Sequence, residues 1–191
     1  MRFEDGCTIR LYRQTIEDFG LYTGMELSIE RLSELKDAAG AMSAKMRAVR
    51  IVSASSVSKS DLERRLVQKG ENPRQAHDAV NWMAQLDLVD DRKTAYQVVQ
   101  RCIGKGYGSI RAKQALYEKR IPKEYWDEAL EGYPDQMDYI LTYLRGHLSG
   151  GSDEKAVRKA VDALIRRGHS FGTIKAALAE INMEMDEFPE D

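Results

Sequence analysis

Three segments of the chain share one pattern, and this pattern decides the fold. Residues 62–70 read LERRLVQKG, residues 112–120 read AKQALYEKR and residues 160–168 read AVDALIRRG. In each, an apolar residue precedes a leucine by four positions, and a basic residue follows that leucine by three. The leucines are 50 and 48 residues apart, within the range of helical arrays whose units pack against their neighbours. The sequence therefore predicts three helical repeats.

The pattern continues past each break, which lets the repeats be given boundaries. Fourteen residues beyond each leucine, an apolar residue follows an alanine. We predict a mainly α fold of tandem three-helix repeats in an elongated array. The first repeat spans 43–91, the second 92–135, and the third 136–191, which ends in an acidic tail. Connector helices are expected over 92–103 and 136–148 because apolar residues recur there at helical spacing.

The first 42 residues form an extension of a different kind. Residues 7–12 alternate apolar and polar side chains, and residues 15–22 do so more weakly. This alternation predicts a small β-hairpin, closed by Gly24. A helix over 28–39 should follow.

Residues that favour helix ends mark the remaining boundaries. Gly40 is expected to end the first helix before a second begins near residue 43. Ser60 and Glu63 have the spacing of a capping box, and Asn72-Pro73 that of a cap followed by proline at the first helical position. Pro122 is expected to begin the equivalent helix of the middle repeat.

Composition excludes several classes of protein. Of the 191 residues, 42% are apolar and 31% charged, as in globular domains, and no uninterrupted apolar run reaches the ~18 residues of a spanning helix. An acidic pair stands near the start, where a signal peptide would have its apolar run, so we expect a cytoplasmic protein. Cys7 and Cys102 are too far apart in sequence for a disulfide framework, and the three histidines stand alone. No metal site is expected.

No pattern indicates catalysis or a bound cofactor. The glycine-rich residues 104–109, GKGYGS, follow a helical stripe, whereas a dinucleotide fingerprint follows a strand. We interpret them as a helix stop with Ser109 as the cap of the next helix. The acidic pairs Asp90-Asp91 and Asp186-Glu187 lack histidine partners, and no serine or cysteine has a recognisable histidine and acid partner. We therefore predict no catalytic residue and no cofactor, and an enzyme is disfavoured.

Charge is segregated along a chain whose net charge is only −2. Residues 101–120 and 155–175 each carry a net charge of +5, whereas residues 176–191 carry −6. Each basic run alone could be a solvated helix face, but its recurrence in two repeats favours a basic stripe that contacts a polyanion or an acidic protein groove. The candidate contact residues are Arg64, Arg65, Lys69, Lys105, Arg111, Lys113, Lys119, Arg120, Arg158, Lys159, Arg166, Arg167 and Lys175.

Several motifs together resemble the RecX family of recombinase regulators. They are residues 60–70 (SDLERRLVQKG), 88–91 (LVDD), 105–108 (KGYG) and 164–168 (LIRRG), within a resemblance that covers about residues 45–182. Where the family commonly has Lys-Gly-Ile, residues 119–121 read Lys-Arg-Ile. The resemblance implies a non-enzymatic protein of three-helix units that lies in the groove of the RecA filament. It also implies that the protein limits growth of the RecA filament, strand exchange and the coprotease activity of RecA.

The partners implied are the RecA filament and, as in some family members, DNA, bound weakly and without sequence preference by a monomer. A DNA-binding regulator of the helix-turn-helix type is the alternative. It would need a recognition helix rich in base-reading side chains, whereas residues 123–131 and 173–181 are acidic or apolar.

Overall fold

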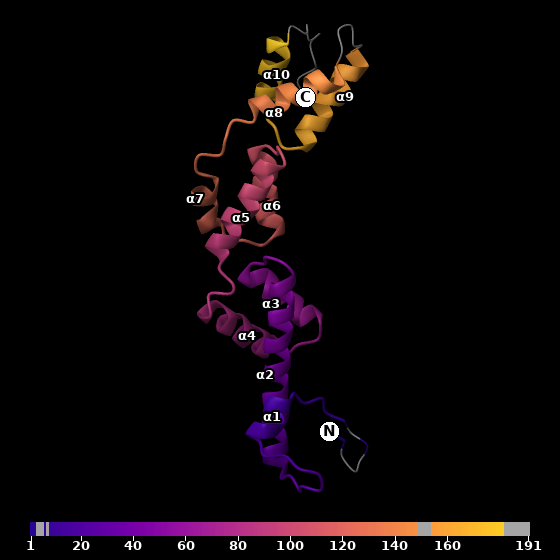
Figure 1. Ribbon diagram of the computed structural model, residues 1–191, viewed down its shortest axis with the longest axis vertical. Helices are drawn as coiled ribbons and strands as arrows, with labels where there is room; N and C mark the ends of the chain where they lie inside the picture. The colour runs from indigo at the N-terminus through magenta and orange to yellow at the C-terminus, as the bar shows by residue number, and fades with distance from the viewer. Residues whose placement is uncertain (3–5, 7, 149–153, 182–191) are drawn as a thin grey trace. The chain divides into compact units, whose positions relative to one another are not determined.

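The computed structural model describes residues 1–2, 6, 8–148 and 154–181 (Figure 1). Over these residues the chain forms ten α-helices and one 3-10 helix, and no strand is present among them, so the mainly α prediction is confirmed. The chain divides after Asp91 into two compact units. The predicted loop at 150–152 and the last ten residues of the acidic tail lie outside the described residues.

The first unit is built on three helices that enclose one apolar core. They are α2 (Ile29–Ala54), α3 (Lys59–Gln68) and α4 (Pro73–Gln85). Alanines of α2 allow α4 to approach it closely, and Leu62 and Leu66 of α3 are fully buried against them. Asn72 caps α4, since its side chain accepts a hydrogen bond from the Arg74 N–H at 2.9 Å with Pro73 in the first turn, as predicted.

The predicted break at Gly40 is wrong, because α2 runs through it without interruption. A Cβ atom at this position would lie 2.3 Å from the Gln75 side chain of α4. Gln75 in turn donates a hydrogen bond to the Asp37 carbonyl at 3.3 Å. Gly40 thus provides space for a neighbouring helix, whereas the sequence pattern was interpreted as a helix stop.

The predicted N-terminal hairpin is also wrong. Arg2 and Thr8 form one isolated antiparallel bridge, and residues expected in the second strand instead form α1 (Arg13–Asp18). Side chains four residues apart support this helix, since Arg13 pairs with Glu17 at 2.8 Å. Cys7, in the first predicted strand, lies outside the described residues.

The second unit contains two further apolar cores, each made by three successive helical segments. The middle core lies among α5 (Asp91–Gly104), α6 (Ser109–Glu118) and the short pair η1 (Lys123–Tyr125) and α7 (Trp126–Leu130). The last core lies among α8 (Met137–His147), α9 (Glu154–Arg166) and α10 (Phe171–Glu180). Leu66, Leu116 and Leu164 all have 0% exposure, which confirms their predicted equivalence.

Three helix starts differ from the sequence-based expectation. Ser58, not Ser60, caps α3 by accepting a hydrogen bond from the Asp61 N–H at 3.1 Å. Gly108, not Ser109, occupies the cap position of α6, and close packing there leaves no room for a side chain. Pro122 precedes a 3-10 turn, so the helix predicted over 123–131 is shortened to α7.

Candidate functional site

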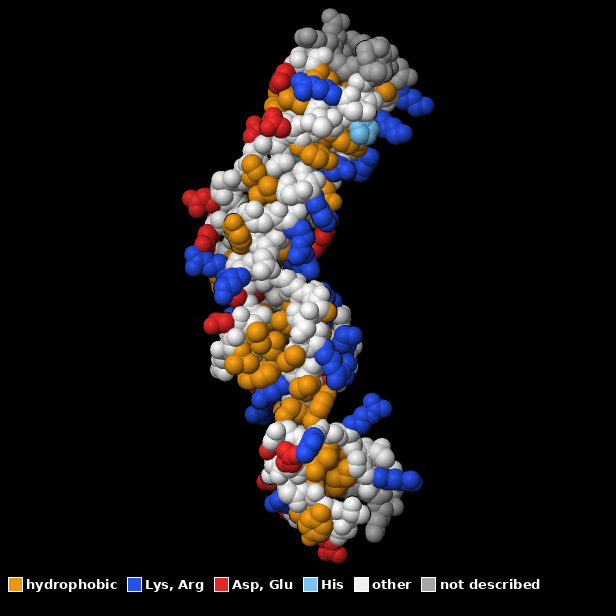
Figure 2. Space-filling view, in the orientation of Figure 1, with side chains coloured by type: hydrophobic (Ala, Val, Ile, Leu, Met, Phe, Trp, Pro, Cys, Tyr) orange, Lys and Arg blue, Asp and Glu red, His pale blue; other side chains and the backbone are white. Residues whose placement is uncertain are grey.

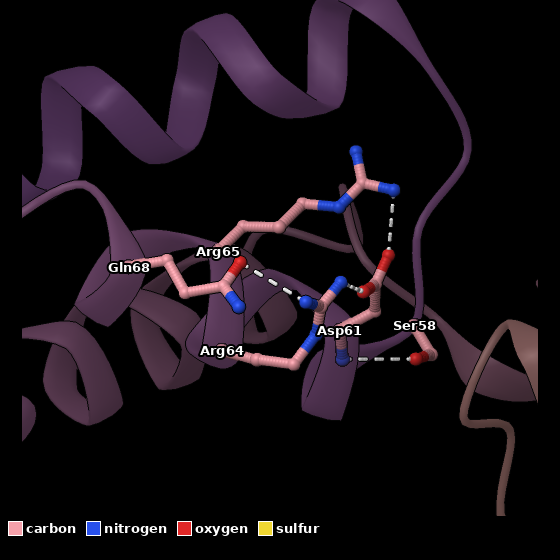
Figure 3. Close-up of polar contacts among 5 residues, drawn as sticks. All are labelled: Ser58, Asp61, Arg64, Arg65 and Gln68. Atoms are coloured by element: carbon pink, nitrogen blue, oxygen red, sulfur yellow. Dashed lines mark hydrogen bonds and ion pairs between the residues drawn. The ribbon is translucent and has the colours of Figure 1, made fainter.

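Arg64 and Arg65 share a single buried carboxylate on α3 (Figure 3). The Asp61 side chain is 3% exposed, and its two oxygens lie 2.6 Å from Arg64 Nη2 and 2.8 Å from Arg65 Nη2. Burial disfavours the ionised Asp61, but hydrogen bonds from both arginines outweigh this and lower the pKa of its carboxyl. About a third of each arginine side chain remains exposed. The structure thus fixes both guanidinium groups at the surface of the first unit.

The turn after α6 retains its geometry although it lacks the family's glycine. Arg120 adopts a left-handed backbone conformation with φ 54°, and the glycines at the equivalent positions, Gly70 and Gly168, have φ 90° and 85°. In all three turns the next residue donates its N–H to the carbonyl of the anchor leucine, at 3.1 Å for Ile121 and Leu116. The turn therefore forms with arginine, at a cost of roughly 1–2 kcal/mol relative to glycine.

Glycines of the 104–109 loop join the second and third repeats. A Cβ atom on Gly106 would lie 2.2 Å from the Tyr139 ring, and one on Gly108 would lie 1.9 Å from the Gly168 carbonyl oxygen. The Gly108 N–H donates to the Arg167 carbonyl at 3.0 Å. The interpretation of this loop as a helix stop is correct, and its last two glycines additionally allow two repeats to touch through their backbones.

The side chain of Arg167 is surrounded by tyrosines at this joint. Its guanidinium lies 5.6–6.0 Å from the ring centres of Tyr107, Tyr139 and Tyr143, within the range of cation–π attraction. It also donates a hydrogen bond to the Tyr139 hydroxyl at 2.5 Å. Arg167 was predicted from its position in a basic run to contact a partner, and the structure places it in contact with aromatic side chains of its own chain.

His169 completes the joint from the turn between α9 and α10. Its ring is 5% exposed, stacks on Tyr139 at 5.8 Å between ring centres, and has Nε2 3.0 Å from the Gly106 carbonyl oxygen. Burial lowers the pKa of His169, and the positive charge of Arg167 lowers it further. The neutral ring is therefore the form that fits between the two repeats.

The other predicted contact residues lie at varied places on the surface. Arg111 pairs with Glu118 at 2.8 Å, and the ammonium group of Lys105 lies 6.0 Å from the Tyr107 ring centre. Figure 2 shows Lys and Arg side chains along the right-hand margin of the second unit. The remaining candidates that are exposed to solvent are Lys69, Lys113, Arg120, Arg158, Lys159, Arg166 and Lys175, whereas Lys119 is half-buried.

Exposed apolar side chains accompany these cations, and sequence reasoning missed them. Ile110 is 58% exposed and Tyr117 is 73% exposed, two turns apart on one face of α6 with Lys113 and Gln114 between them. In each repeat the residue after the anchor leucine is exposed, since Val67 and Ile165 have 40% and 46% exposure. The helical stripe through Leu116 could have shown that its neighbour Tyr117 faces solvent. Basic and apolar side chains together are suited to contact another protein.

A reactive thiol, a metal-binding cluster and a membrane-spanning helix are other features that could indicate a function. Cys102 is buried, and burial raises the pKa of its thiol, which disfavours the reactive thiolate. Over the described ranges, no group of three His, Cys, Asp or Glu side chains is arranged to hold a metal ion. None of the helices found there is long and apolar enough to cross a membrane.

Comparison with known proteins identifies the fold. Residues 90–130 match the family model described as RecX, second three-helix domain. A crystal structure of regulatory protein RecX superimposes with a TM-score of 0.69 at 18% identity, covering 93% of this chain and 92% of the other. The crystal structure of RecX from Lactobacillus salivarius gives a TM-score of 0.65 at 20% identity, covering 76% and 98% of the two chains.

Curated relatives carry the same name. A regulatory protein RecX from Vibrio parahaemolyticus is 27% identical over 147 residues, 75% of this chain and 95% of the relative. One from Xanthomonas axonopodis pv. citri is 30% identical over 123 residues, 63% and 76% of the two chains. The fold thus defines a protein of tandem three-helix repeats, and the relatives are named regulatory proteins. The chain belongs to the RecX family.

Proposed function

We propose that this chain binds the RecA nucleoprotein filament and inhibits RecA ATPase, strand exchange and coprotease activity, and so regulates recombination, DNA repair and the SOS response. Membership of the RecX family carries this proposal, since the relatives are named regulatory proteins. The chain acts without catalysis of its own, as a cytoplasmic monomer. Its direct contact with DNA is weak and independent of sequence.

The surfaces of the repeats support a role as a filament partner. Exposed cations recur in the second and third repeats, where they suit the phosphates or acidic side chains of a filament. The exposed Ile110 and Tyr117 beside Lys113 add apolar area, which gains free energy when a partner surface removes it from water. Contacts that recur in successive repeats can engage successive subunits, and each raises the effective concentration of the next.

The test is an ATPase series in which this protein is added to RecA on single-stranded DNA at fixed salt. We expect substoichiometric protein to lower ATP hydrolysis and filament length, and the protein alone to hydrolyse no ATP. The double variant Lys113→Glu with Arg166→Glu should inhibit at least ~10-fold less strongly, since each charge change adds repulsion at a contact. A matched control, Lys123→Glu with Arg145→Glu, changes two exposed cations outside the predicted set.

Circular dichroism and thermal melting first establish that both variants fold as the parent does. If the folded protein leaves ATPase and filament length unchanged at equimolar amounts, the proposed function is wrong. Equal inhibition by both double variants and the parent would instead assign the predicted basic residues to solvent.

A further inference from the structure

Four arginines outside the predicted contact set border one pocket in the first unit. Its volume is about 730 Å³, and its lining residues come from the N-terminal segment and from α2. Arg2 and Arg10 come from the N-terminal segment, and Arg47 and Arg50 come from α2. Among the described residues that line the pocket, none is an aspartate or glutamate.

The pocket residues that belong to α2 lie on one face of that helix. Ser43, Arg47 and Arg50 stand at helical spacing and therefore on the same side of α2. Glu71, buried behind them, accepts a hydrogen bond from Arg47 Nε at 2.6 Å and another from the Ser43 hydroxyl at 3.0 Å. This carboxylate holds Arg47 in place and offsets one positive charge.

Backbone contacts join the two ends of the N-terminal segment to each other. Arg2 and Thr8 form the isolated bridge, and the Ile9 N–H donates to the Met1 carbonyl at 3.0 Å. Arg2 and Arg10 of this segment border the pocket. Ile9, Leu11 and Tyr12 add an apolar and aromatic part to the same lining.

This arrangement selects a class of ligand. Arginine cannot lose its proton in a protein, so even with Arg47 paired to Glu71 the other three guanidinium groups leave positive charge around the pocket, which a bound anion would offset. Their planar donor groups match the oxygens of phosphate. Tyr12 and the aliphatic side chains suit a base or a sugar, which a carboxylate or sulfate ligand would lack.

We infer that this pocket binds a nucleotide-type ligand, with Arg2, Arg10, Arg47 and Arg50 on its phosphates and Tyr12 beside its base or sugar. The phosphates can belong to a nucleic-acid strand or to a free nucleotide. This inference does not depend on the proposed RecA contact, because it concerns the first unit and a ligand bound without RecA.

The test measures binding of the full chain, in the absence of RecA, to a fluorescein-labelled oligodeoxythymidylate strand and to ATP, each across a salt series. The variant Arg10→Glu with Arg50→Glu removes two exposed arginines and leaves the Arg47–Glu71 pair intact. We expect it to bind at least ~10-fold more weakly. For the strand, the salt slope should fall by about 1.4, since each lost phosphate contact removes ~0.7.

The control variant Lys36→Glu with Arg74→Glu makes the same charge change at exposed positions outside the pocket lining and should bind as the parent does. Binding of the strand but not of ATP identifies the phosphodiester backbone as the ligand, and competition by ATP identifies a free nucleotide. If Arg10→Glu with Arg50→Glu impairs folding, Arg10→Gln with Arg50→Gln replaces it. Absence of binding by the parent, or equal loss in the pocket and control variants, would overturn the inference.

Discussion

At the scale of single residues, Asp61 shows how a buried charge is kept in a small helical core. It is 2% exposed, and its two carboxylate oxygens are each paired with an arginine that reaches solvent. Because the arginines are only partly buried, the pair costs less to desolvate than a fully buried one. The carboxylate also follows the Ser58 cap, where negative charge near a helix N-terminus is favourable.

Replacement of Asp61 by asparagine should destabilise the first unit by about 1–3 kcal/mol at pH 7, because two charge-assisted hydrogen bonds are lost. The pKa of Asp61 is lower in the folded chain than in the unfolded one, so its contribution is present above the ordinary range near ~4 and disappears as pH falls through the folded value. Urea unfolding at neutral and acid pH measures this difference. Asp162→Asn, at an exposed position of α9, is the control, and equal stability of both variants at pH 7 would contradict the assignment.

His169 should make the second unit sensitive to acid. Burial lowers its pKa in the folded chain, so the unfolded chain binds more protons and stability decreases as pH falls through ~6.5 toward the folded value. His169→Gln keeps a donor for the Gly106 carbonyl and removes the titrating ring. Its melting temperature should change less between neutral and mildly acid pH than that of the parent. An unchanged pH slope in His169→Gln would disprove the role.

Some of these contacts between residues could be predicted from the sequence, and others could not. Asp61 precedes Arg64 and Arg65 by three and four positions, so their pairing on one helix face could be predicted from the sequence. The choice between Ser58 and Ser60 as the cap could not be predicted from the sequence, because both precede an acidic residue by three positions. Tyr107 and Tyr139 precede Arg167 by 60 and 28 residues, and only the packing of two repeats brings them together.

At the scale of elements, glycine has three distinct roles that a sequence pattern does not separate. Gly40 lies inside a continuous helix beside Gln75, Gly168 has a left-handed backbone at a helix end, and Gly108 allows backbone contact between repeats. The sequence interpretation treated Gly40 and the glycine-rich residues 104–109 alike as helix stops, and of these two it succeeded only at residues 104–109. Which role applies depends on the neighbouring element, and helical periodicity contains no information about that neighbour.

The backbone contact at Gly108 gives a prediction about how elements are joined. A Cβ atom there would lie 1.9 Å from the Gly168 carbonyl oxygen, and two backbone segments cannot yield as a flexible side chain would. Gly108→Ala should therefore lower the free energy of unfolding by about 1–3 kcal/mol, as overpacking does. Gly146→Ala is the control, since its Cβ meets open space on α8 and the change should stabilise the helix by up to about 1 kcal/mol. Equal melting temperatures for Gly108→Ala and Gly146→Ala would show that the backbone contact between the repeats can open without loss of stability.

At the scale of the whole molecule, the repeats differ in how they depend on their neighbours. Leucines of equivalent position anchor all three cores, which is why the spacing of 50 and 48 residues predicted the architecture. The second and third repeats also share the buried His169 ring and the hydrogen bond from Gly108 to Arg167. Within the first unit, the Asp91 carboxylate accepts a hydrogen bond from the Lys59 N–H at 2.8 Å, which ties the end of that unit to the start of α3.

We therefore expect the chain to unfold in two blocks that meet at residues 91 and 92. Fragments 1–91 and 92–191 should each be helical by circular dichroism and melt cooperatively, because each contains complete cores and keeps its own buried contacts. Fragment 92–135 should be largely unfolded, since removal of the third repeat exposes the faces around Gly106 and Gly108 that pack on Tyr139 and Gly168. Within 92–191, Leu116→Ala and Leu164→Ala should lower the same single melting transition. Two separated transitions in this fragment, or a stable 92–135, would show instead that each repeat folds independently.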